Sequence, residues 1–311
     1  MAGHNYARAL WKLGIYDKAR QVVEKVYEKR CVVLGNSNPD TLKSYGLLAI
    51  MLFNLGDYKH SLLILTQVYE KRKLLLGDNH PNTISALNNI GHANIRLGNY
   101  QKALDIYEQV YEKRKLLLGD NHPDTIGALN NIGHANNVLG NYQKAVDIYE
   151  QVYEKRKLLL GDNHPNTIQT QNNIANIYHR LGKPQEGLPY IESALQHAET
   201  AEIPADSLIR YKDTLAWLYI DLGRYAEAKA LANALLEESL KKSPENKDFL
   251  GARYHLLASI YEKTQEYAFA LPAAQKAYEY RASALPETHK DVIEVKTQLD
   301  RIQAAIQEEE K

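Results

Sequence analysis

Apolar and small residues recur along this chain at the spacing of an amphipathic helix, in pairs of stretches separated by a short turn. The clearest pair carries Leu87, Ile90, Gly91 and Asn94, followed by Ala103, Ile106, Tyr107, Val110 and Tyr111. Positions three and four residues apart lie on one face of a helix, so each stretch predicts an amphipathic helix. Gly98 lies between the stretches and can take the left-handed conformation that ends a helix. The pair therefore predicts a helical hairpin.

The hairpin pattern is repeated almost without change. Residues 77–118 and 119–160 are two copies of one 42-residue unit. They differ at Asn82/Asp124, Ser85/Gly127, Ile95/Asn137, Arg96/Val138 and Leu104/Val146. A fixed period of this length indicates an array of structural repeats, in which neighbouring hairpins bury each other's apolar faces.

Charge, cysteine content and hydropathy exclude several classes of function. Lysine plus arginine number 38 and aspartate plus glutamate number 38, so no net charge attracts nucleic acid or anionic lipid. A single cysteine excludes an internal disulfide framework and favours a reducing compartment. No run of about 18 apolar residues and no signal peptide occur in the sequence, so a cytoplasmic, non-membrane protein is expected.

No motif for chemistry stands out. The sequence has no Gly-rich phosphate loop, no cysteine pair, no Ser elbow and no HExxH. We therefore expect no enzyme activity, no cofactor and no metal site.

The turn and the small-residue positions resemble the tetratricopeptide repeat. These features are the small residue Gly91, followed by Ala103 and Tyr107, and the turn Leu97-Gly98-Asn99-Tyr100. The 42-residue period and the phrases LGDNHP, ALNNIG and NYQKALDIYEQVYEKR are similar to the kinesin light chain type of this repeat. The resemblance implies an all-α fold, a right-handed α-solenoid of seven helical hairpins followed by a C-terminal capping helix.

Alignment on the turn divides the chain as a single array. The expected repeats are 1–33, 34–75, 76–117, 118–159, 160–202, 203–244 and 245–285, with a capping helix over 286–311. The first helix lacks the Asn-His-Pro lead-in of the later repeats, so we expect a fragment of a larger protein. An alternative function is accordingly that of a sensor or spacer region, with an effector domain outside this sequence.

A second stripe on the first helix of each hairpin is the candidate binding surface. Asparagine is a poor helix former, so a pair of asparagines in three successive helices indicates a role other than helix formation. A side-chain amide offers donors and an acceptor that match the backbone of an extended peptide. The resemblance implies that the second asparagine of each pair has this role.

The candidate peptide-binding residues are Asn5, Asn88, Asn89, His92, Arg96, Asn130, Asn131, His134, Asn137, Asn172, Asn173, Asn176 and Arg180. Two alternatives to ligand binding stay open for the asparagines. Duplication of a repeat also duplicates its asparagines, whether or not they bind a ligand. Alternatively, the side-chain amides can form hydrogen bonds to neighbouring helices.

The charge on this stripe predicts the kind of partner. The stripe carries Arg8, Lys12, Lys43, Arg96, Arg180 and Arg210 with His4, His92, His134 and His179, and no carboxylate before Asp213 and Asp221. A basic trough favours an acidic, extended segment of another protein. Trp11, Phe53 and Trp217 are candidate apolar anchors. Self-association through an exposed end of the array is a further partner hypothesis.

Two recurring strings have structural interpretations. Lys113, Arg114 and Lys115 of the YEKRK string lie at a helix end, and we expect Glu108 and Glu112 to pair with them. The Asp-Asn-His string precedes a helix start, where we expect its Asp and Asn to cap backbone N–H groups.

Overall fold

The structure, a computed structural model, describes residues 2–201, 203–242, 244–287 and 289–309. Its contacts group into two compact units, residues 1–155 and 156–311, and the boundary falls inside a helix. Each unit is described by itself below.

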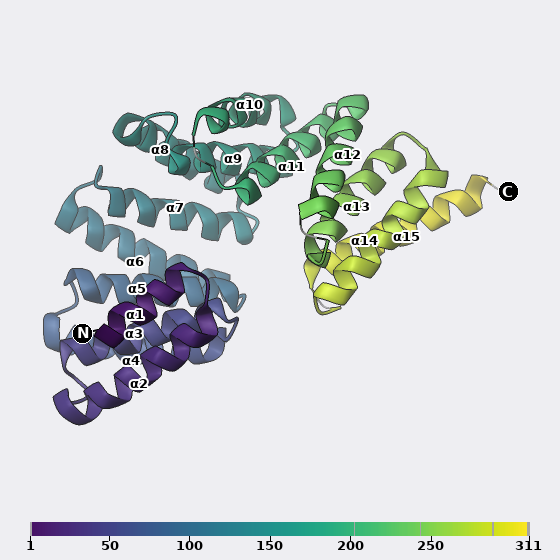
Figure 1. The fold of residues 1–311 in the computed structure, drawn as a ribbon. Helices are drawn as coiled ribbons and strands as arrows, with labels where there is room; N and C mark the ends of the chain where they lie inside the picture. Colours follow the sequence, from purple (N-terminus) through teal and green to yellow (C-terminus); the bar gives the residue numbers. More distant parts are fainter. Residues whose placement is uncertain (1, 202, 243, 288, 310–311) are drawn as a thin grey trace. The chain divides into compact units, whose positions relative to one another are not determined.

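The described residues form fifteen helices and no strand, arranged as seven consecutive hairpins and a final helix (Figure 1). The helices that begin in the first unit are α1 (Ala2–Lys12), α2 (Tyr16–Leu34), α3 (Pro39–Asn54), α4 (Tyr58–Leu76), α5 (Pro81–Arg96), α6 (Tyr100–Leu118), α7 (Pro123–Val138) and α8 (Tyr142–Leu160). The second unit continues with α9 (Pro165–Arg180), α10 (Pro184–Thr200), α11 (Ala205–Asp221), α12 (Tyr225–Lys242), α13 (Lys247–Lys263), α14 (Tyr267–Ala284) and α15 (Lys290–Glu309). The prediction of an all-α array of seven hairpins plus one helix is confirmed.

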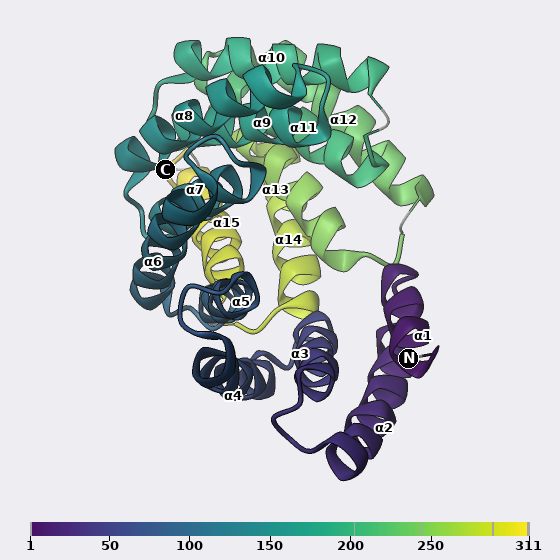
Figure 2. The same ribbon diagram turned by 90° about the vertical axis from the view of Figure 1, so that its left-hand side faces the viewer.

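Helices of the first unit follow one another in space as they do in sequence. Consecutive helices from α1 to α7 pack together, and Figure 2 shows α3, α4 and α5 side by side. The second helix of each early hairpin ends one residue beyond the repeat boundary expected from the sequence, for example at Leu34 and Leu76. Helix ends are defined only to within a residue or two, so the expected period is preserved.

Histidine caps the first helix of three hairpins, which corrects the expected role of the Asp-Asn-His string. The Nδ1 atom of His80 accepts a hydrogen bond from the backbone N–H of Asn82 at 3.1 Å, and Pro81 occupies the first turn. Asp78 does not cap this helix; its carboxylate accepts from the Tyr69 hydroxyl at 3.1 Å and pairs with Lys113. An imidazole nitrogen can accept a hydrogen bond as a carboxylate oxygen does, so histidine can serve as the cap. The aspartate instead contacts side chains of α4 and α6.

The turn inside each hairpin depends on a backbone conformation that glycine adopts without strain. Gly98 has a φ of 79°, and the glycines at the equivalent turns of five other hairpins also have positive φ angles. In the seventh hairpin Gln265 occupies this position with a φ of 60°. The turn is therefore kept where its glycine is lost.

Close approach of the two helices in a hairpin requires small residues. Ala103 is fully buried, and a Cβ added to Gly91 would lie 2.5 Å from Cε1 of Tyr107, whose side chain is also fully buried. Asn94, on the same face, is buried with its amide donating to the Ile90 carbonyl at 2.8 Å. Its Oδ1 accepts from the Asn99 amide at 3.2 Å, so this buried polar side chain has both a donor and an acceptor bond.

Arginine side chains join each of the first four hairpins to the next. Arg72 at the end of α4 donates to the Asn82 carbonyl at 3.0 Å, and Arg114 at the end of α6 donates to the Asp124 carbonyl at 2.9 Å. Arg30 and Arg156 make the same contact, at 2.6 and 3.0 Å. The arginine of the YEKR string is therefore a link between repeats, not a solvated cation.

The neighbouring lysine ties the second helix of a repeat to the loop at the start of the same repeat. Lys113 pairs with Asp78 and donates to Asn79 at 3.2 Å, both in the loop that follows α4. Lys155 does the same with Asp120 and Asn121. The expected pairing of Lys113 with Glu108 and Glu112 is thus wrong, because the loop at the start of the same repeat offers the carboxylate of Asp78 instead.

The final helix closes the second unit. Val292, Val295 and Ile302 of α15 are buried, with Leu299 and Ile306 packed against the same core. Arg301 of α15 forms a two-point ion pair with Glu262 of α13. The single apolar stripe therefore covers the last hairpin, as expected of a capping helix. Within the described ranges no helix combines the length and the apolar composition needed to cross a membrane.

Candidate functional site

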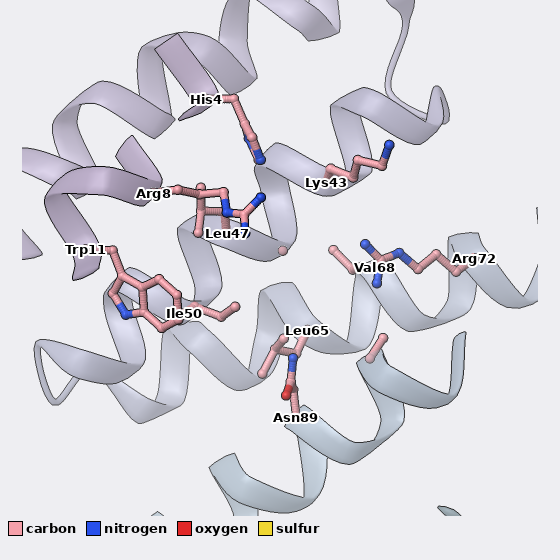
Figure 3. Close-up of a pocket in the computed structure, with 12 residues that line it drawn as sticks. His4, Arg8, Trp11, Lys43, Leu47, Ile50, Leu65, Val68, Arg72 and Asn89 are labelled. Carbon is pink, nitrogen blue, oxygen red and sulfur yellow. The ribbon is translucent and has the colours of Figure 1, made fainter. Parts of the chain in front are cut away.

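The first unit contains a groove between the first helices of repeats one to three. It encloses about 330 Å³ (Figure 3). We call it the first-unit groove; it is lined by His4, Arg8, Trp11, Lys43, Gly46, Leu47, Ile50, Leu65, Val68, Arg72, Ala86 and Asn89. An adjoining cavity of about 370 Å³ shares Trp11, Ile50, Leu65 and Asn89 and adds Phe53 and His92. Together they make a continuous lined depression along α1, α3 and α5.

Cations surround the first-unit groove. Figure 3 shows the imidazole of His4 and the guanidinium groups of Arg8 and Arg72 directed toward the space between the helices. Lys43 lines it too and pairs with Asp40 at 3.2 Å. Among the described residues, neither Arg8 nor Arg72 forms an ion pair with a carboxylate. Two arginines at the groove thus keep their charge uncompensated.

The cations near the groove also affect the pKa of His4. Its pKa lies below the usual value, first because the ring is partly buried and then because Arg30, Arg8 and Lys43 lie near it. Neighbouring cations disfavour a further positive charge. The groove therefore favours the neutral form of His4, whose Nδ1 lies 3.3 Å from the Ser44 hydroxyl.

The floor of the groove is apolar. Leu47, Leu65 and Val68 are buried in the main core of the first unit, and Trp11, Ile50 and Phe53 pack partly exposed against that core. The expected anchors Trp11 and Phe53 thus lie at the groove. Trp11 presents its ring on the wall formed by α1 (Figure 3).

The two asparagines of repeat three differ in what they bond. Asn89 lines the groove and its amide makes no hydrogen bond to any other described residue. Asn88 accepts from the Nδ2 of Asn131 at 3.0 Å and lies 3.0 Å from Nε2 of His92. In repeat three, then, the amide of the second asparagine has no hydrogen bond to another described residue, whereas the first asparagine bonds to a neighbouring helix.

A chain of polar groups crosses from repeat three to repeat four. His92 Nδ1 lies 2.9 Å from the Tyr107 hydroxyl, and its ring meets the Tyr107 ring edge to face. If the Asn88 amide donates to Nε2, Nδ1–H donates to Tyr107, which is the arrangement of a neutral imidazole. Burial, followed by His134 and Arg114, lowers the pKa of His92 to about 4. His92 is therefore neutral near pH 7 and does not add to the positive charge of the groove.

The remaining candidates of the first unit are spread over several surroundings. Asn5 is exposed on α1 outside the residues that line the groove. Arg96 is exposed and contacts Tyr58, with its guanidinium 4.9 Å from the ring centre. Asn130 and Asn137 are half-buried on α7, and the Oδ1 of Asn137 is buried with no hydrogen-bond partner. His134 is exposed on the same helix.

The second unit has its own groove, of about 270 Å³, between α9, α11 and α13. It is lined by Asn172, Asn176, Arg210, Asp213, Thr214, Trp217, Ala252, Arg253, His255 and Arg281. Asn172 accepts from the Thr214 hydroxyl at 2.9 Å, so this amide also bonds a neighbouring helix. Asn173 is half-buried on α9, and Arg180 lies 3.3 Å from Asn176. Trp217, the third expected anchor, contacts the rings of His179 and His255.

A buried ion pair lies at the wall of this second groove. Arg253 is only 2% exposed and pairs with Asp213, which lies at the groove wall. Burial, and then the charge of Arg281, lower the pKa of Arg253 to about 10. Because carboxylates lie beside these arginines, the groove of the second unit is less positive than that of the first.

Sequence reasoning missed Arg72, which reaches the groove from a second helix. The candidate stripe lies on the first helix of each hairpin, whereas Arg72 comes from the end of α4. Its signal was the YEKR string itself, repeated at Arg30, Arg72, Arg114 and Arg156.

Comparison with protein families identifies the class. Models of the tetratricopeptide repeat match residues 1–25, 41–82, 64–116, 82–157, 124–200 and 168–237. These matches cover well over half of the chain, and the chain belongs to the tetratricopeptide repeat family. A search of curated proteins found no match.

Solved structures place the repeats in the kinesin light chain-like type. A variant of a kinesin light chain protein with nearly identical TPR-like repeats from Podosopora anserina is 25% identical, with a TM-score of 0.57 over 64% of this chain and 94% of that one. BtubC (BKLC) from P. vanneervenii is 15% identical, with a TM-score of 0.63 over 73% and 92%. The quorum sensor NprR from B. thuringiensis, solved in complex with its cognate peptide NprX as well as in the apo form, is 17% identical in the complex, with a TM-score of 0.59 over 99% and 86%. The last two likenesses concern the fold alone.

Proposed function

We propose that this protein is a non-enzymatic interaction scaffold whose first-unit groove binds an extended, acidic segment of a partner protein. The observation that carries the proposal is the pair Arg8 and Arg72, both at the groove and neither paired with a carboxylate of the described residues. An unpaired cation beside an apolar surface gains most from a carboxylate brought by a ligand.

Each part of the groove has a role in this proposal. The apolar floor of Leu47, Leu65 and Trp11 takes side chains of the ligand, while Asn89 offers its amide to the ligand backbone. Asn89 supports this role because its amide is open, whereas Asn88 is engaged with Asn131. The complex of NprR with its peptide supports the view that this fold accommodates a peptide, although that likeness concerns the fold only.

The roles proposed for the asparagines differ accordingly. Asn89 binds the ligand directly, and Asn131 holds Asn88 while facing the same stripe on α7. Asn173 on α9 keeps its predicted role for a ligand of the second unit. Asn5 is the candidate with the least support, since it lies outside the residues that line the groove.

The test compares two peptides of opposite charge. A fluorescein-labelled peptide of alternating glutamate and leucine is titrated with the protein by fluorescence anisotropy, and one of alternating lysine and leucine is the control probe. We expect the acidic peptide to bind more tightly and its affinity to fall as salt rises, because exposed charges are screened.

Matched variants locate the site. Arg8→Gln removes one exposed cation from the groove and is expected to weaken binding of the acidic peptide roughly two- to fivefold. Lys102→Gln removes a cation that is also exposed, from α6 outside the groove, and no change is expected. Asn89→Ala is expected to weaken both peptides alike, since it removes a backbone contact. Equal affinity for the two peptides, or an effect of Lys102→Gln as large as that of Arg8→Gln, would contradict the proposal.

A further inference from the structure

An apolar ridge runs along the edge of the first unit where the second helices of the hairpins end. It consists of Val32, Val33, Leu34, Leu74, Leu75, Leu76, Leu116, Leu117 and Leu118, which we call the leucine ridge. The outermost residues Val32, Leu74 and Leu116 are 88%, 86% and 80% exposed. Single exposed leucines are ordinary, but nine apolar side chains in three equivalent triplets of the first unit are not. A fourth triplet of the same kind, Leu158, Leu159 and Leu160, is exposed at the end of α8 and belongs to the second unit.

Hydrogen bonds show that the triplets lie side by side. Lys71 near the end of α4 donates to the Asn36 carbonyl in the loop after α2, at 3.4 Å. Lys113 near the end of α6 donates to Asn79 in the loop after α4. Each helix end is thus tied to the loop that follows the preceding triplet, and the triplets form one row.

Folding of a hairpin does not require this row. The second helices of repeats five to seven end instead in Glu199-Thr200, Lys241-Lys242 and Ser283-Ala284, and they form the same hairpins. Repeats one and two differ from repeat three at most other positions, yet both keep an apolar triplet before the glycine. The apolar triplets are therefore confined to the first four repeats, and closing a hairpin does not depend on them.

The charge around the ridge decides which class of partner fits. Residues 28–40, 70–82 and 112–124, which carry the triplets and their flanks, contain eight lysines and arginines and seven aspartates and glutamates. A nearly neutral edge offers little attraction to an anionic lipid surface or to nucleic acid. The exposed carbonyl groups at the helix ends add partial negative charge there, which disfavours an anionic partner further. A protein surface with apolar residues and both signs of charge is the complement.

We infer that the leucine ridge is a dimerisation surface that pairs with the same ridge of a second copy of this chain. Two copies carry triplets at the same spacing, so their rows match along the whole length when they lie antiparallel about a two-fold axis. An isologous contact of this kind closes on itself and gives dimers, not open-ended filaments.

The size of the surface is sufficient for a reversible dimer. Nine exposed apolar side chains present an area on the order of several hundred Å², comparable to the largest apolar patches seen on monomers. With their polar flanks they approach the roughly 800 Å² per partner of a standard interface. This inference is independent of the peptide proposal, since no residue of the leucine ridge lines the first-unit groove.

The experiment measures mass against concentration by sedimentation velocity. The full chain is expected to move from a monomer of 35.4 kDa toward twice that mass as its concentration rises. The ridge variant Leu74→Gln with Leu116→Gln is expected to weaken the dimer by at least about tenfold, because each leucine leaves the buried interface. Both side chains are almost fully exposed in the monomer, so the fold does not depend on them.

The matched control is Leu13→Gln with Leu63→Gln, two exposed leucines outside the ridge, whose dimer should stay within twofold of the parent. A parent chain that stays monomeric at every concentration overturns the inference, as does a control variant that loses the dimer equally. Species that grow beyond the dimer point to stacking of array ends and also overturn it. Sedimentation with vesicles of phosphatidylserine and phosphatidylcholine is the last arm, and binding lost in the ridge variant without any dimer assigns the ridge to lipid instead.

Discussion

A graded series of glycine substitutions tests the packing between the two helices of a hairpin. In α5 and α7 three helical glycines differ in the space around them. A Cβ at Gly91 would lie 2.5, 2.9 and 3.0 Å from the Tyr107 ring atoms Cε1, Cδ1 and Cζ. At Gly133 the nearest atoms, of Ile148 and Tyr149, lie 3.3 Å away, and at Gly127 nothing lies within 4 Å.

The expected magnitudes follow from two opposing effects. Alanine in place of a helical glycine gains roughly 0.5–1 kcal/mol from lower backbone entropy in the unfolded chain. Carbon atoms in contact prefer about 3.5–4.0 Å, and overpacking a filled core costs roughly 1–3 kcal/mol. Tyr107 is fully buried and its hydroxyl is bonded to His92, so its ring cannot turn aside without losing contacts.

We therefore expect Gly127→Ala to stabilise the protein by up to about 1 kcal/mol and Gly91→Ala to destabilise it by about 1–2 kcal/mol. Gly133→Ala should lie between them, near zero. Urea unfolding followed by far-UV circular dichroism measures the three midpoints against the parent chain. If Gly91→Ala is as stable as Gly127→Ala, the contact of Gly91 with Tyr107 is not the reason for a small residue at this position.

Three further predictions concern single contacts. The pKa of His92 is about 4 in the folded chain and near 6.5 in the unfolded chain, so the unfolded state binds more protons between these pH values. The free energy of unfolding should therefore fall by roughly 2–3 kcal/mol as the pH drops from 6.5 to 4. Urea unfolding measured at each pH tests this, because His92→Gln should remove that part of the pH dependence. His122→Ala should cost about 1 kcal/mol in thermal unfolding while His122→Asn costs little, because the side chain caps α7 and asparagine is a good cap; equal losses would contradict this role. Asp213→Asn should destabilise the second unit by about 3–5 kcal/mol by leaving the buried Arg253 unpaired, whereas Asp213→Leu with Arg253→Met should recover most of the loss in urea unfolding.

The hairpins and their order could be predicted from the sequence because they depend on local spacing. Apolar residues three and four apart define each helix, and Gly98 marks the turn between Leu97 and Tyr100. The 42-residue period then gives the number of repeats, since each hairpin packs on its neighbours in the same way. None of these features depends on which side chain touches which.

Hydrogen-bond partners across repeats could not be predicted, because several partners lie within reach of each side chain. Lys113 had Glu108 and Glu112 one turn away, yet it pairs with Asp78, whose carboxylate is already fixed by Tyr69. In the same way, histidine and not aspartate caps the first helix of the hairpin, because the aspartate bonds to side chains of other helices. In both cases the geometry between hairpins selects among residues that are equivalent in sequence.

What the sequence determined by itself is the fold class and the stripe of asparagines and cations, since both follow from periodicity. Only the tertiary structure decided which members of the stripe bond to other residues of the chain. Packing engages Asn88 and neutralises His92, leaves Asn89 open, and brings Arg72 to the groove from another helix. It also left the leucine ridge exposed, although apolar triplets in the sequence would ordinarily be assigned to the core. The physical reason is that periodicity fixes the face of a helix, whereas burial and pairing depend on what the neighbouring helix places against that face.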